Sequence, residues 1–391
     1  MSVLGLGYIG LPTAIMLARC GYEVLGYDAN PNVVASLQRG KIHIKENDLQ
    51  LYFEKVFNEG TLKIVDNVVE SDVFIVAVPT PFKESIGKKE ADLSYIDAAA
   101  KLVSKVLKEE NLVVLESTSP PMTTRRMTDM LVAETGLDRN SFYTAHCPER
   151  VLPGRILYEL EHNDRIIGAE REEAAMKAKE VYQPMVKEGH IYITDDVTAE
   201  MAKLVENSYR DVNIAFANEL SLVCDELNID VNELIQLANK HPRVNILQPG
   251  IGVGGHCISV DPWFLVEKFE KANIIKMART VNDSKPYWVA HKIEEAINYD
   301  KSKVIGILGL AFKPNIDDLR ESPSEVIIKE LLNKGYRVIG CEPNVNEDTA
   351  FGIKLMSIEE CYESADILLL AQQHDEFIEA KEMIDDKLIV L

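Results

Sequence analysis

The stretch that decides the fold is SVLGLGYIGLPTAIMLAR at residues 2–19. Three residues of strand character precede glycines at positions 5, 7 and 10, and an apolar helical pattern follows. Gly5 allows a tight turn, Gly7 lets the backbone approach a pyrophosphate, and Gly10 lets the helix pack on the strand. The helix N-terminus then offers unpaired N–H groups to phosphates. The stretch therefore predicts a strand, a turn and a helix that bind a dinucleotide.

A second strand supplies the acid that such a turn uses to hold a ribose. The segment Tyr22–Tyr27 is typical of a strand. Asp28 follows it directly and stands 18 residues after Gly10. A carboxylate at this place accepts hydrogen bonds from both ribose hydroxyls and repels a 2′-phosphate. We therefore expect NAD rather than NADP. A glycine-rich turn without a ligand is the alternative interpretation of the glycines alone.

Two further strands end close to residues with hydroxyl groups. The apolar runs Val73–Val78 and Leu112–Leu115 are typical of parallel strands that are covered on both faces. Thr80 and Thr118 follow these strands, and ligands of doubly wound sheets lie beyond the carboxyl ends of the strands. Both threonines are therefore candidate ligand contacts. A hydroxyl that only forms a turn is the alternative for each.

The middle of the chain is predicted to be helical from Thr198 to about Asn239. Lys203, Asn207 and Arg210 stand at positions i, i+4 and i+7, so they share one face of the helix. This polar stripe is either functional or simply solvated, and the residues alone leave both interpretations open.

A second alternation of strands and helices follows the helical segment. Gly306 and Gly309 lie in its first strand, but they lack the full glycine pattern of the first unit, which favours a different ligand. We expect strands at residues 304–310, 337–341, 365–370 and 387–391, and a helix at residues 324–333.

The segment QPGIGVGGHCISVDP at residues 248–262 is the least ordinary part of the sequence. Four glycines within six residues allow close backbone approach, and Cys257 stands two residues after the last of them. A thiol on such a loop is a poor core residue but a good nucleophile where neighbouring charge lowers its pKa. Cys257 is therefore a candidate catalytic residue. His256 is adjacent but is not expected to act with it, and Cys147 is a weaker candidate for a place near the site.

The composition excludes several classes of protein. The 391 residues include 42 Lys and Arg against 63 Asp and Glu, a net charge of −21, with 46% hydrophobic residues. This balance argues against nucleic acid or an anionic membrane as the main partner. No apolar run reaches the roughly 20 residues of a membrane span. The six cysteines form no metal-binding or disulfide pattern, and no leader is apparent, so we expect no metal site and a cytoplasmic protein.

Taken together, these segments resemble the UDP-glucose/GDP-mannose dehydrogenase family along essentially the whole chain. This resemblance implies an α/β fold with two Rossmann-like, doubly wound parallel-sheet units joined by a central helical domain. We expect an NAD-binding domain at residues 1–190, a helical dimerisation domain with the Cys257 loop at residues 191–298, and a UDP-sugar-binding domain at residues 299–391. The active site is expected between the two α/β units. The matching segments are residues 5–10, VPTP at 78–81, EST at 116–118, CPER at 147–150, residues 203–207, GGHC at 254–257 with Asp261, and GLAFK at 309–313 with Asp318, Arg320, Ser322 and Pro323.

Within the family, several stretches are most similar to the members that oxidise UDP-N-acetyl-D-mannosamine. UDP-glucose dehydrogenases commonly carry a lysine where this chain has Val260, which weakens a UDP-glucose interpretation. The stretches are VLPG at residues 151–154, RDVNIAFANE at 210–219, HPRVNIL at 241–247 and DPWF at 261–264.

The resemblance implies a four-electron oxidation at C6 of the sugar that consumes two NAD⁺. Cys257 would hold the aldehyde as a thiohemiacetal and then the acid as a thioester, which water hydrolyses. Lys203 would exchange the proton and, with Asn207, stabilise the developing oxyanion. Asp261 and Thr118 would position a water. Glu149 is a candidate base for the hydrolysis, and a plain ion pair with an arginine is its alternative.

The resemblance also implies which residues bind the two nucleotides. The expected NAD contacts are Gly5, Gly7, Tyr8, Ile9, Gly10, Asp28, Thr80, Thr118 and Arg320. Family members are usually dimers or larger, so a homodimer or higher oligomer is expected, in which His241 and Arg243 reach a partner subunit. The substrate candidates, several of which would pair with the UDP phosphates, are Arg150, Val151, Lys203, Asn207, Arg210, His241, Arg243, Gly254, Phe312 and Lys313.

Three alternatives stay open. In the first, the substrate is another UDP-sugar, such as UDP-glucose, UDP-GlcNAc or a UDP-galactosamine derivative. In the second, the chain binds NAD and a UDP-sugar without turnover, and the joint presence of Cys257, Lys203 and Asp261 argues against this. In the third, the enzyme is a two-electron dehydrogenase of the 6-phosphogluconate type, and such an enzyme has no use for the Cys257 loop.

Overall fold

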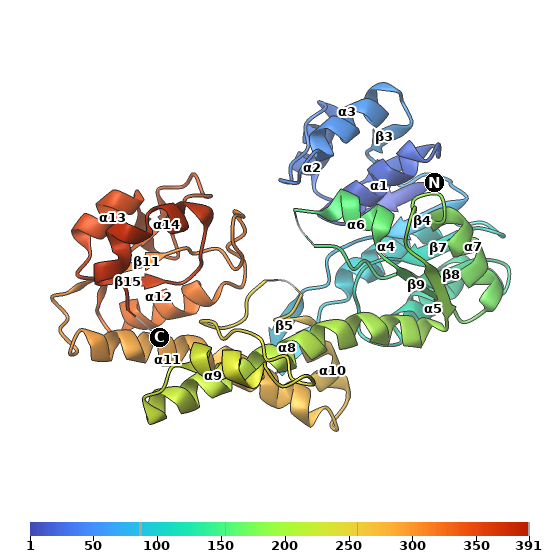
Figure 1. Cartoon of the computed structure of the whole chain (residues 1–391). Coiled ribbons are helices and arrows are strands. Elements are labelled where there is room, and N and C mark those ends of the chain that lie inside the picture. Colours follow the sequence, from blue (N-terminus) through green and yellow to red (C-terminus); the bar gives the residue numbers. More distant parts are fainter. Residues whose placement is uncertain (86–87, 153, 256, 390–391) are drawn as a thin grey trace. The chain divides into compact units, whose positions relative to one another are not determined.

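The chain folds into two compact units, Met1–Glu206 and Asn207–Leu391 (Figure 1). This is a computed structural model, which describes residues 1–85, 88–152, 154–255 and 257–389. Each unit contains a predominantly parallel sheet, so each is treated as a fold of its own.

The first unit is built on an eight-stranded sheet in the order β10-β9-β8-β7-β4-β1-β2-β3. All neighbouring strands run parallel except β8 and β9, which meet at a single antiparallel pair. The strands are β1 Ser2–Leu4, β2 Val24–Tyr27, β3 Leu62–Val65, β4 Val73–Val76, β7 Leu112–Leu115, β8 Tyr143–His146, β9 Arg165–Gly168 and β10 Ile191–Thr194.

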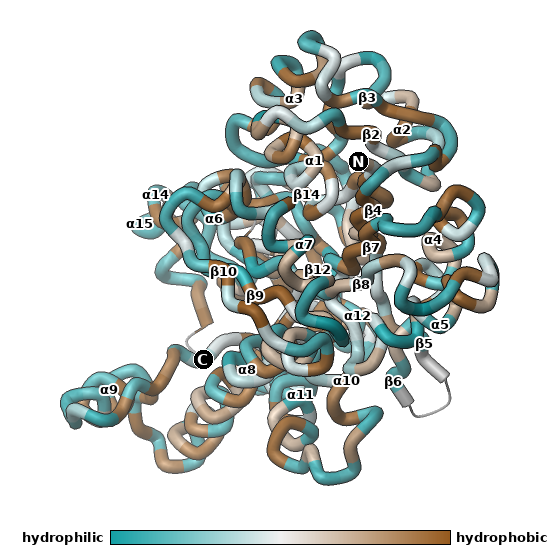
Figure 2. The backbone as a smooth tube through the Cα atoms, turned by 90° about the vertical axis from the view of Figure 1, so that its right-hand side faces the viewer, coloured by the Kyte–Doolittle hydropathy of each residue, from teal (hydrophilic) through white to brown (hydrophobic). Residues whose placement is uncertain are grey.

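Helices cover both faces of this sheet because the strands are apolar on both faces. Along β4, Phe74 and Val76 belong to one buried cluster, while Ile75 between them belongs to the other. Because side chains alternate across a strand, a continuous apolar run is buried on both faces of the sheet. Strands β4 and β7 are coloured as hydrophobic (brown) along their length in Figure 2. The helices are α1 Gly10–Arg19, α2 Pro31–Gln38, α3 Leu49–Asn58, α4 Ser94–Ser104, α5 Thr123–Thr135, α6 Ile156–His162 and α7 Glu172–Tyr182, and a separate hairpin pairs β5 Phe82–Ser85 with β6 Lys88–Ala91.

The predicted helical segment at 198–239 is two helices rather than one. Helix α8 covers Asp196–Leu227, and α9 covers Val231–Ala238. The break lies at Asn228, whose φ of 54° is left-handed, and Asp230 then caps α9 by accepting from the backbone N–H of Asn232. A left-handed residue cannot continue a right-handed helix, so the chain restarts with a new cap.

Two more helices belong to the second unit before its sheet begins. Helix α10 covers Asp261–Lys268, directly after the glycine-rich loop, and α11 covers Asn273–Ala296 with Pro286 in its interior. They extend the helical part of the chain well beyond α9.

The second sheet has the order β13-β14-β12-β11-β15, parallel except for β13 and β14. Two buried clusters again cover it. The strands are β11 Val304–Leu308, β12 Arg337–Cys341, β13 Thr349–Ala350, β14 Ile353–Leu355 and β15 Ile367–Leu370, and the helices are α12 Pro323–Asn333, α13 Ile358–Ser364, α14 Asp375–Glu379, α15 Lys381–Ile384 and the 3₁₀ turn Asp385–Lys387.

The predicted last strand at residues 387–391 starts later than expected in the part that the structure describes. Residues 385–387 form a 3₁₀ turn, Leu388 makes a parallel bridge with Leu368, and the N–H of Ile389 donates to the carbonyl oxygen of Leu368 at 2.9 Å. Residues 390–391 lie outside the described part.

The predicted fold class, two doubly wound parallel-sheet units with helices between them in the sequence, is confirmed. No helix among the described residues combines the length and the apolar character needed to cross a membrane.

Candidate active site

The turn after β1 requires glycine at two positions. Gly5 has φ = +88°, and a Cβ there would lie 2.5 Å from the carbonyl oxygen of Ala77. A Cβ on Gly10 would lie 1.9 Å from the carbonyl oxygen of Gly5. No larger residue fits either contact, so the first strand and the first helix pack backbone against backbone.

Gly7 lies in a different environment. A Cβ at this position would meet nothing within 4 Å, so the backbone faces open space. Helix α1 begins three residues later and has no side-chain cap at Ile9, which leaves N–H groups of its first turn without a side-chain acceptor. Tyr8 and Ile9 are half-buried beside this space. The turn therefore fits the pyrophosphate of a dinucleotide.

Asp28 follows β2 and organises the same turn. Its Oδ2 accepts the N–H of Leu6 at 2.8 Å, and its Oδ1 accepts the N–H of Asn30 at 2.8 Å. The carboxylate is half-buried, and the place after the second strand is the one at which a ribose is held in dinucleotide folds.

Thr80 and Thr118 meet at the carboxyl ends of neighbouring strands. The Oγ1 of Thr80 donates to the carbonyl oxygen of Thr118 at 2.6 Å, which joins the loops after β4 and β7. The structure thus brings the two threonines together, as their positions after adjacent parallel strands imply.

A buried polar network includes Glu116, two residues before Thr118, and Arg165, neither of which was among the predicted site residues. Arg165 contacts Glu149 at 2.7 Å and Glu116 at 4.0 Å. Glu116 also accepts from Thr13 of α1 at 3.1 Å and from Tyr182 at 3.2 Å. One feature of the sequence indicates such a network. Glu116 directly follows an apolar strand, and a buried acid at this place needs a partner from a distant part of the chain.

Burial decides the protonation of this network. Burial, and then the charge of Glu149, raise the pKa of Glu116 from 4.5 to about 8. Burial also raises the pKa of Cys147 to about 12, with Arg165 opposing it. Cys147 is therefore an unreactive core thiol whose sulfur lies 3.6 Å from Arg165.

Glu149 has the arginine partner that the sequence left open as its alternative. Besides Arg165, it accepts the backbone N–H of Arg150 at 2.8 Å. The Arg150 side chain contacts Glu206 at 2.6 Å and also donates to the carbonyl oxygen of Asp164. The ion pair of Glu149 is present, and its role as a base stays a prediction.

The polar stripe of α8 is not simply solvated. Lys203 and Asn207 are buried, at 9% and 5% exposed, whereas Arg210 is exposed. Asn207 donates its side-chain N–H to Asp261 Oδ2 at 2.5 Å, within the second unit. A buried amide and carboxylate in contact are the kind of pair that can orient a water or a substrate oxygen.

Cys257 lies one turn before Asp261. All six cysteines lie among the described residues, and Cys257 is the one with an exposed side chain. Its carbonyl oxygen accepts the N–H of Asp261 at 2.8 Å, so the loop leads directly into α10. His256 lies outside the described residues.

The glycines before Cys257 let this loop pack on the second α/β fold. A Cβ on Gly254 would lie 2.6 Å from the carbonyl oxygen of Glu321, and one on Gly255 would lie 2.7 Å from the ring of Phe312. A Cβ on Gly252, which has φ = +141°, would lie 2.9 Å from Pro286 and 3.0 Å from Pro323. The predicted substrate residues Gly254 and Phe312 are thus in direct contact.

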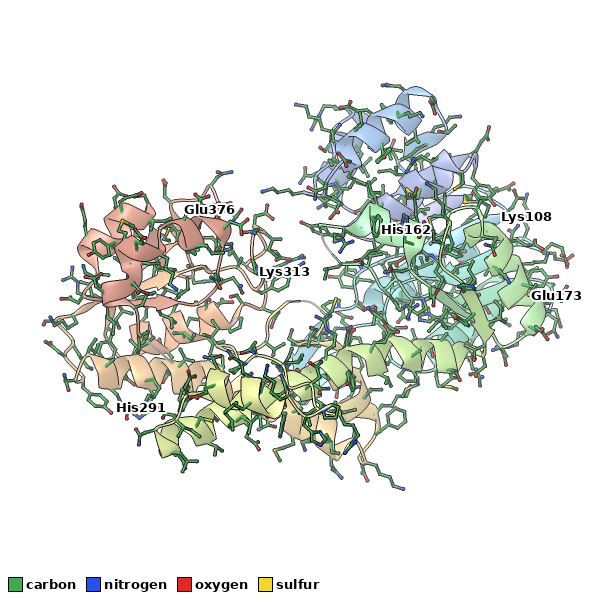
Figure 3. All side chains as sticks on the ribbon, viewed as in Figure 1. Lys108, His162, Glu173, His291, Lys313 and Glu376 are labelled. Carbon is green, nitrogen blue, oxygen red and sulfur yellow. The ribbon has the colours of Figure 1, made fainter. Side chains whose placement is uncertain are left out.

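The remaining candidates lie nearer the surface. Lys313 is half-buried on the loop after β11 and is labelled in Figure 3. Val151 is half-buried, and His241 and Arg243 are exposed, with the Arg243 N–H 3.4 Å from His241 Nδ1. Arg320 is exposed and makes a two-point contact with Asp318 at 2.7 and 2.8 Å. No group of three His, Cys, Asp or Glu in the described ranges is arranged to hold a metal ion.

Sequence profiles of one family match the chain in three successive segments. The NAD-binding domain of the UDP-glucose/GDP-mannose dehydrogenase family matches residues 1–186, its central domain residues 197–284, and its UDP-binding domain residues 306–390. The chain belongs to this family. It is an NAD-dependent oxidoreductase, and the predicted cofactor is confirmed.

Individual relatives and solved structures agree with this assignment. A UDP-N-acetyl-D-mannosamine dehydrogenase of Campylobacter jejuni is 48% identical over 97% of each chain. An NDP-N-acetyl-D-galactosaminuronic acid dehydrogenase of Ralstonia nicotianae is 46% identical over 96% of this chain and 91% of its own. The structure of a UDP-D-ManNAc dehydrogenase from Pyrococcus horikoshii superposes with a TM-score of 0.91 at 42% identity, covering 99% and 93%.

Proposed function

We propose that the chain oxidises C6 of UDP-N-acetyl-D-mannosamine to a carboxylate through a covalent bond to Cys257. The observation that carries the proposal is the exposed thiol of Cys257 on a glycine-rich loop, beside the buried pair of Asn207 and Asp261. The relatives that bear the name of this activity support the choice of sugar. The expected location of such an enzyme is the cytoplasm.

The residues of the chain divide the chemistry between them. Lys203 takes the proton of the C6 hydroxyl as the hydride leaves, and Asn207 hydrogen-bonds the same oxygen. Bound NAD⁺ supplies the hydride acceptor, one molecule for each of the two oxidations. Gly5, Gly7 and Gly10 hold its pyrophosphate.

The other cofactor contacts are proposed along the same edge of the first sheet. Asp28 holds the adenosine ribose, and Tyr8, Ile9, Thr80 and Thr118 line the remainder of the nucleotide. Arg320 is assigned to the cofactor as well.

Cys257 carries the intermediate between the oxidations. Its thiolate adds to the aldehyde carbon, the carbonyl π pair moves to oxygen, and this oxygen takes the proton back from Lys203 to give a thiohemiacetal. The second hydride then leaves to NAD⁺ and the oxygen-bound proton to Lys203, which gives a thioester. A water placed by Asp261 and Thr118, and deprotonated by Glu149, then breaks the C–S bond and releases the acid with the thiol.

The proposed substrate contacts gather around the two diphosphate charges and the sugar. Arg150, Arg210, His241, Arg243 and Lys313 supply the positive or titratable groups, and cations are the expected partners of phosphates. Val151, Gly254 and Phe312 complete the contact set with Lys203 and Asn207.

The division of the chain into three domains, with boundaries at residues 190 and 298, is also part of this proposal.

We also infer that the chain self-associates through α8. Tyr209, Phe216, Val223 and Leu227 are exposed, with 70%, 53%, 48% and 63% of their surface accessible. At 100° per residue, these four positions fall within about 40° of one another, so they form a single apolar face, which we call the α8 face. A second copy presents the same face and is the occupant expected for such a surface.

The deciding experiment is a mass balance with purified protein. UDP-N-acetyl-D-mannosamine should yield two NADH for each uronate formed, with no free aldehyde. One NADH for each product would indicate a two-electron dehydrogenase, and absence of turnover with this sugar would refute the assignment.

A second candidate substrate is favoured by the Ralstonia relative, whose name refers to an N-acetyl-D-galactosaminuronic acid. The same assay with the UDP derivatives of N-acetylgalactosamine, N-acetylglucosamine and glucose separates the candidates. We expect the mannosamine sugar to have the highest kcat/KM. Val260, which is buried at the start of α10, places no cation beside Asp261 from this position.

A further inference from the structure

A buried carboxylate and imidazole meet at the carboxyl end of the second sheet, and the mechanism does not use them. Glu342 follows β12, and His374 precedes α14. Their side chains are fully buried, and His374 Nε2 lies 3.1 Å from Glu342 Oε2. A buried pair of this kind is costly unless its remaining hydrogen-bonding positions are filled.

Backbone N–H groups of one loop fill most of those positions, and Asn344 adds its backbone N–H to Glu342 Oε1 at 3.2 Å and its side-chain nitrogen at 3.2 Å from His374 Nδ1. Glu342 Oε2 accepts from Leu310 at 2.6 Å and from Ala311 at 2.9 Å. His374 Nδ1 accepts from the backbone N–H of Asn315 at 2.8 Å. Because Nδ1 is an acceptor here, the ring proton lies on Nε2 and is donated to Glu342.

The pair therefore fixes the backbone of residues 310–315 through these hydrogen bonds, and we call Glu342 and His374 together the brace of this loop. Burial opposes the ionisation of Glu342, but the hydrogen bonds from His374, Ala311 and Leu310 outweigh it, and the pKa of Glu342 lies below its ordinary value. An ionised carboxylate makes these bonds stronger than neutral ones would be.

The first unit shows what is unusual about this brace. There, Asp28 also follows the second strand of the fold and accepts the N–H of the residue after a left-handed glycine, Leu6 after Gly5. Glu342 makes the same bond to Leu310, which follows Gly309 at φ = +81°. Asp28 is half-buried, whereas Glu342 is enclosed, so its carboxylate serves the loop instead of a ligand.

The braced loop carries residues of the proposed substrate site. Phe312 and Lys313 lie between the fixed N–H groups of Ala311 and Asn315. Phe312 also touches the Cys257 loop, because a Cβ on Gly254 would lie 2.8 Å from its Cβ. Displacing the brace would therefore move a lysine assigned to the UDP phosphates and loosen the support of Gly254.

We propose that Glu342 and His374 are positioning residues that hold the loop 310–315 in the conformation that binds the UDP part of the substrate. The inference rests on the proposed function and assigns to it two residues that touch neither substrate nor cofactor. It extends the site from the contact residues to the groups that fix them in place.

Two variants of the full chain test the proposal. Glu342→Gln keeps the shape but removes the charge, and His374→Phe keeps the ring but removes both nitrogens. Each should weaken binding of UDP, measured by calorimetry without turnover, by about tenfold or more, because buried charge-assisted bonds are lost. NADH affinity should change less than about twofold, since all the proposed cofactor contacts except Arg320 lie on the other sheet, and Arg320 is held by Asp318 outside the loop 310–315. The matched control is Glu360→Gln, an exposed acid in the capping box of α13 in the same unit, which should leave UDP affinity unchanged.

Folding and function are separated by two further measurements. Far-UV circular dichroism and thermal unfolding select the variants that fold, and His374→Asn, which retains an acceptor at the Nδ1 position, should recover part of the UDP affinity. In turnover, KM for the UDP-sugar should rise more than kcat falls.

The outcomes separate this inference from the proposed function. Folded variants that bind UDP as tightly as the wild type, or that lose UDP and NADH affinity equally, would overturn the positioning role alone. A wild-type chain that bound no UDP would overturn the proposed function together with this inference.

Discussion

The cysteines of this chain occupy opposite environments. Cys147, Cys341 and Cys361 are buried, and burial raises the pKa of each to about 12. Cys257 is exposed on its loop. Because the thiolate is the nucleophile, the exposure of Cys257 is consistent with the proposed covalent role, and the buried cysteines are poor candidates for it.

Replacing Cys257 with Ser should stop formation of the acid. The alkoxide that serine would need is not formed at neutral pH, so uronate production should fall by about three orders of magnitude or more. Product is measured by chromatography and NADH by absorbance. Cys20→Ser is the control and should be as active as the wild type. Full activity of the Cys257 variant would rule out the covalent route.

Glu116 should make stability depend on pH. Its folded pKa of about 8 lies above the ordinary value of 4.5, so the protonated native state contributes stability that is complete below about pH 4.5 and is lost as pH rises through about 8. Relative to Glu116→Gln, the wild type should lose up to about 1.4 kcal/mol of unfolding free energy per pH unit in this interval.

Urea unfolding at several pH values measures this difference. The Gln variant mimics the protonated acid, because its amide oxygen accepts one hydrogen bond and its NH₂ group donates at the other position, as the acid O–H does. Parallel profiles for the two proteins would contradict the assignment of a raised pKa to Glu116.

Sequence patterns indicate candidate site residues more readily than the contacts that these residues make. Thr80 and Thr118 were placed beyond neighbouring strands, and the structure joins them. Glu116 and Arg165 were missed because their partners are far apart in the sequence and meet only when β7 and β9 lie in one sheet. The pairing of Glu342 with His374 has the same origin.

Among the elements, the turn between β1 and α1 allows two glycines to be tested against each other. Gly10→Ala puts a methyl group 1.9 Å from the carbonyl oxygen of Gly5, so it should destabilise the fold by about 1–3 kcal/mol. Gly7→Ala meets nothing within 4 Å, so it should leave stability nearly unchanged but weaken NAD affinity by blocking the approach of the pyrophosphate.

Thermal unfolding and NADH titration separate the two effects. If Gly7→Ala bound NADH normally, the open space beside Gly7 would not be the cofactor site. If Gly10→Ala were as stable as the wild type, the backbone contact would be less tight than the structure has it.

Elements with a strong local signal were predicted well, and those without one were not. β7 has the bounds that its apolar run predicts. Strands β8 and β9 contain polar residues such as His146 and Arg165 and were not foreseen, because only their partners in the sheet make them buried. The end of α8 depends on a left-handed Asn228, which an apolar periodicity does not reveal.

For the molecule as a whole, the α8 face predicts the state of association. Phe216→Asp places a charge at the centre of the face and should weaken self-association at least about tenfold, because both copies would bury it. Light scattering over a concentration series measures this change. Glu226→Gln, also exposed on α8, is the control, and a wild type that is monomeric at all concentrations would refute the inference.

The distribution of the thiols has a practical consequence. Four of the six cysteines are buried and one is partly covered, so a maleimide dye used at equimolar amounts should attach at Cys257 alone. The labelled chain would carry its fluorophore beside Phe312 and the loop that Glu342 braces. Emission would then report nucleotide arrival at the second unit directly, without any catalytic turnover.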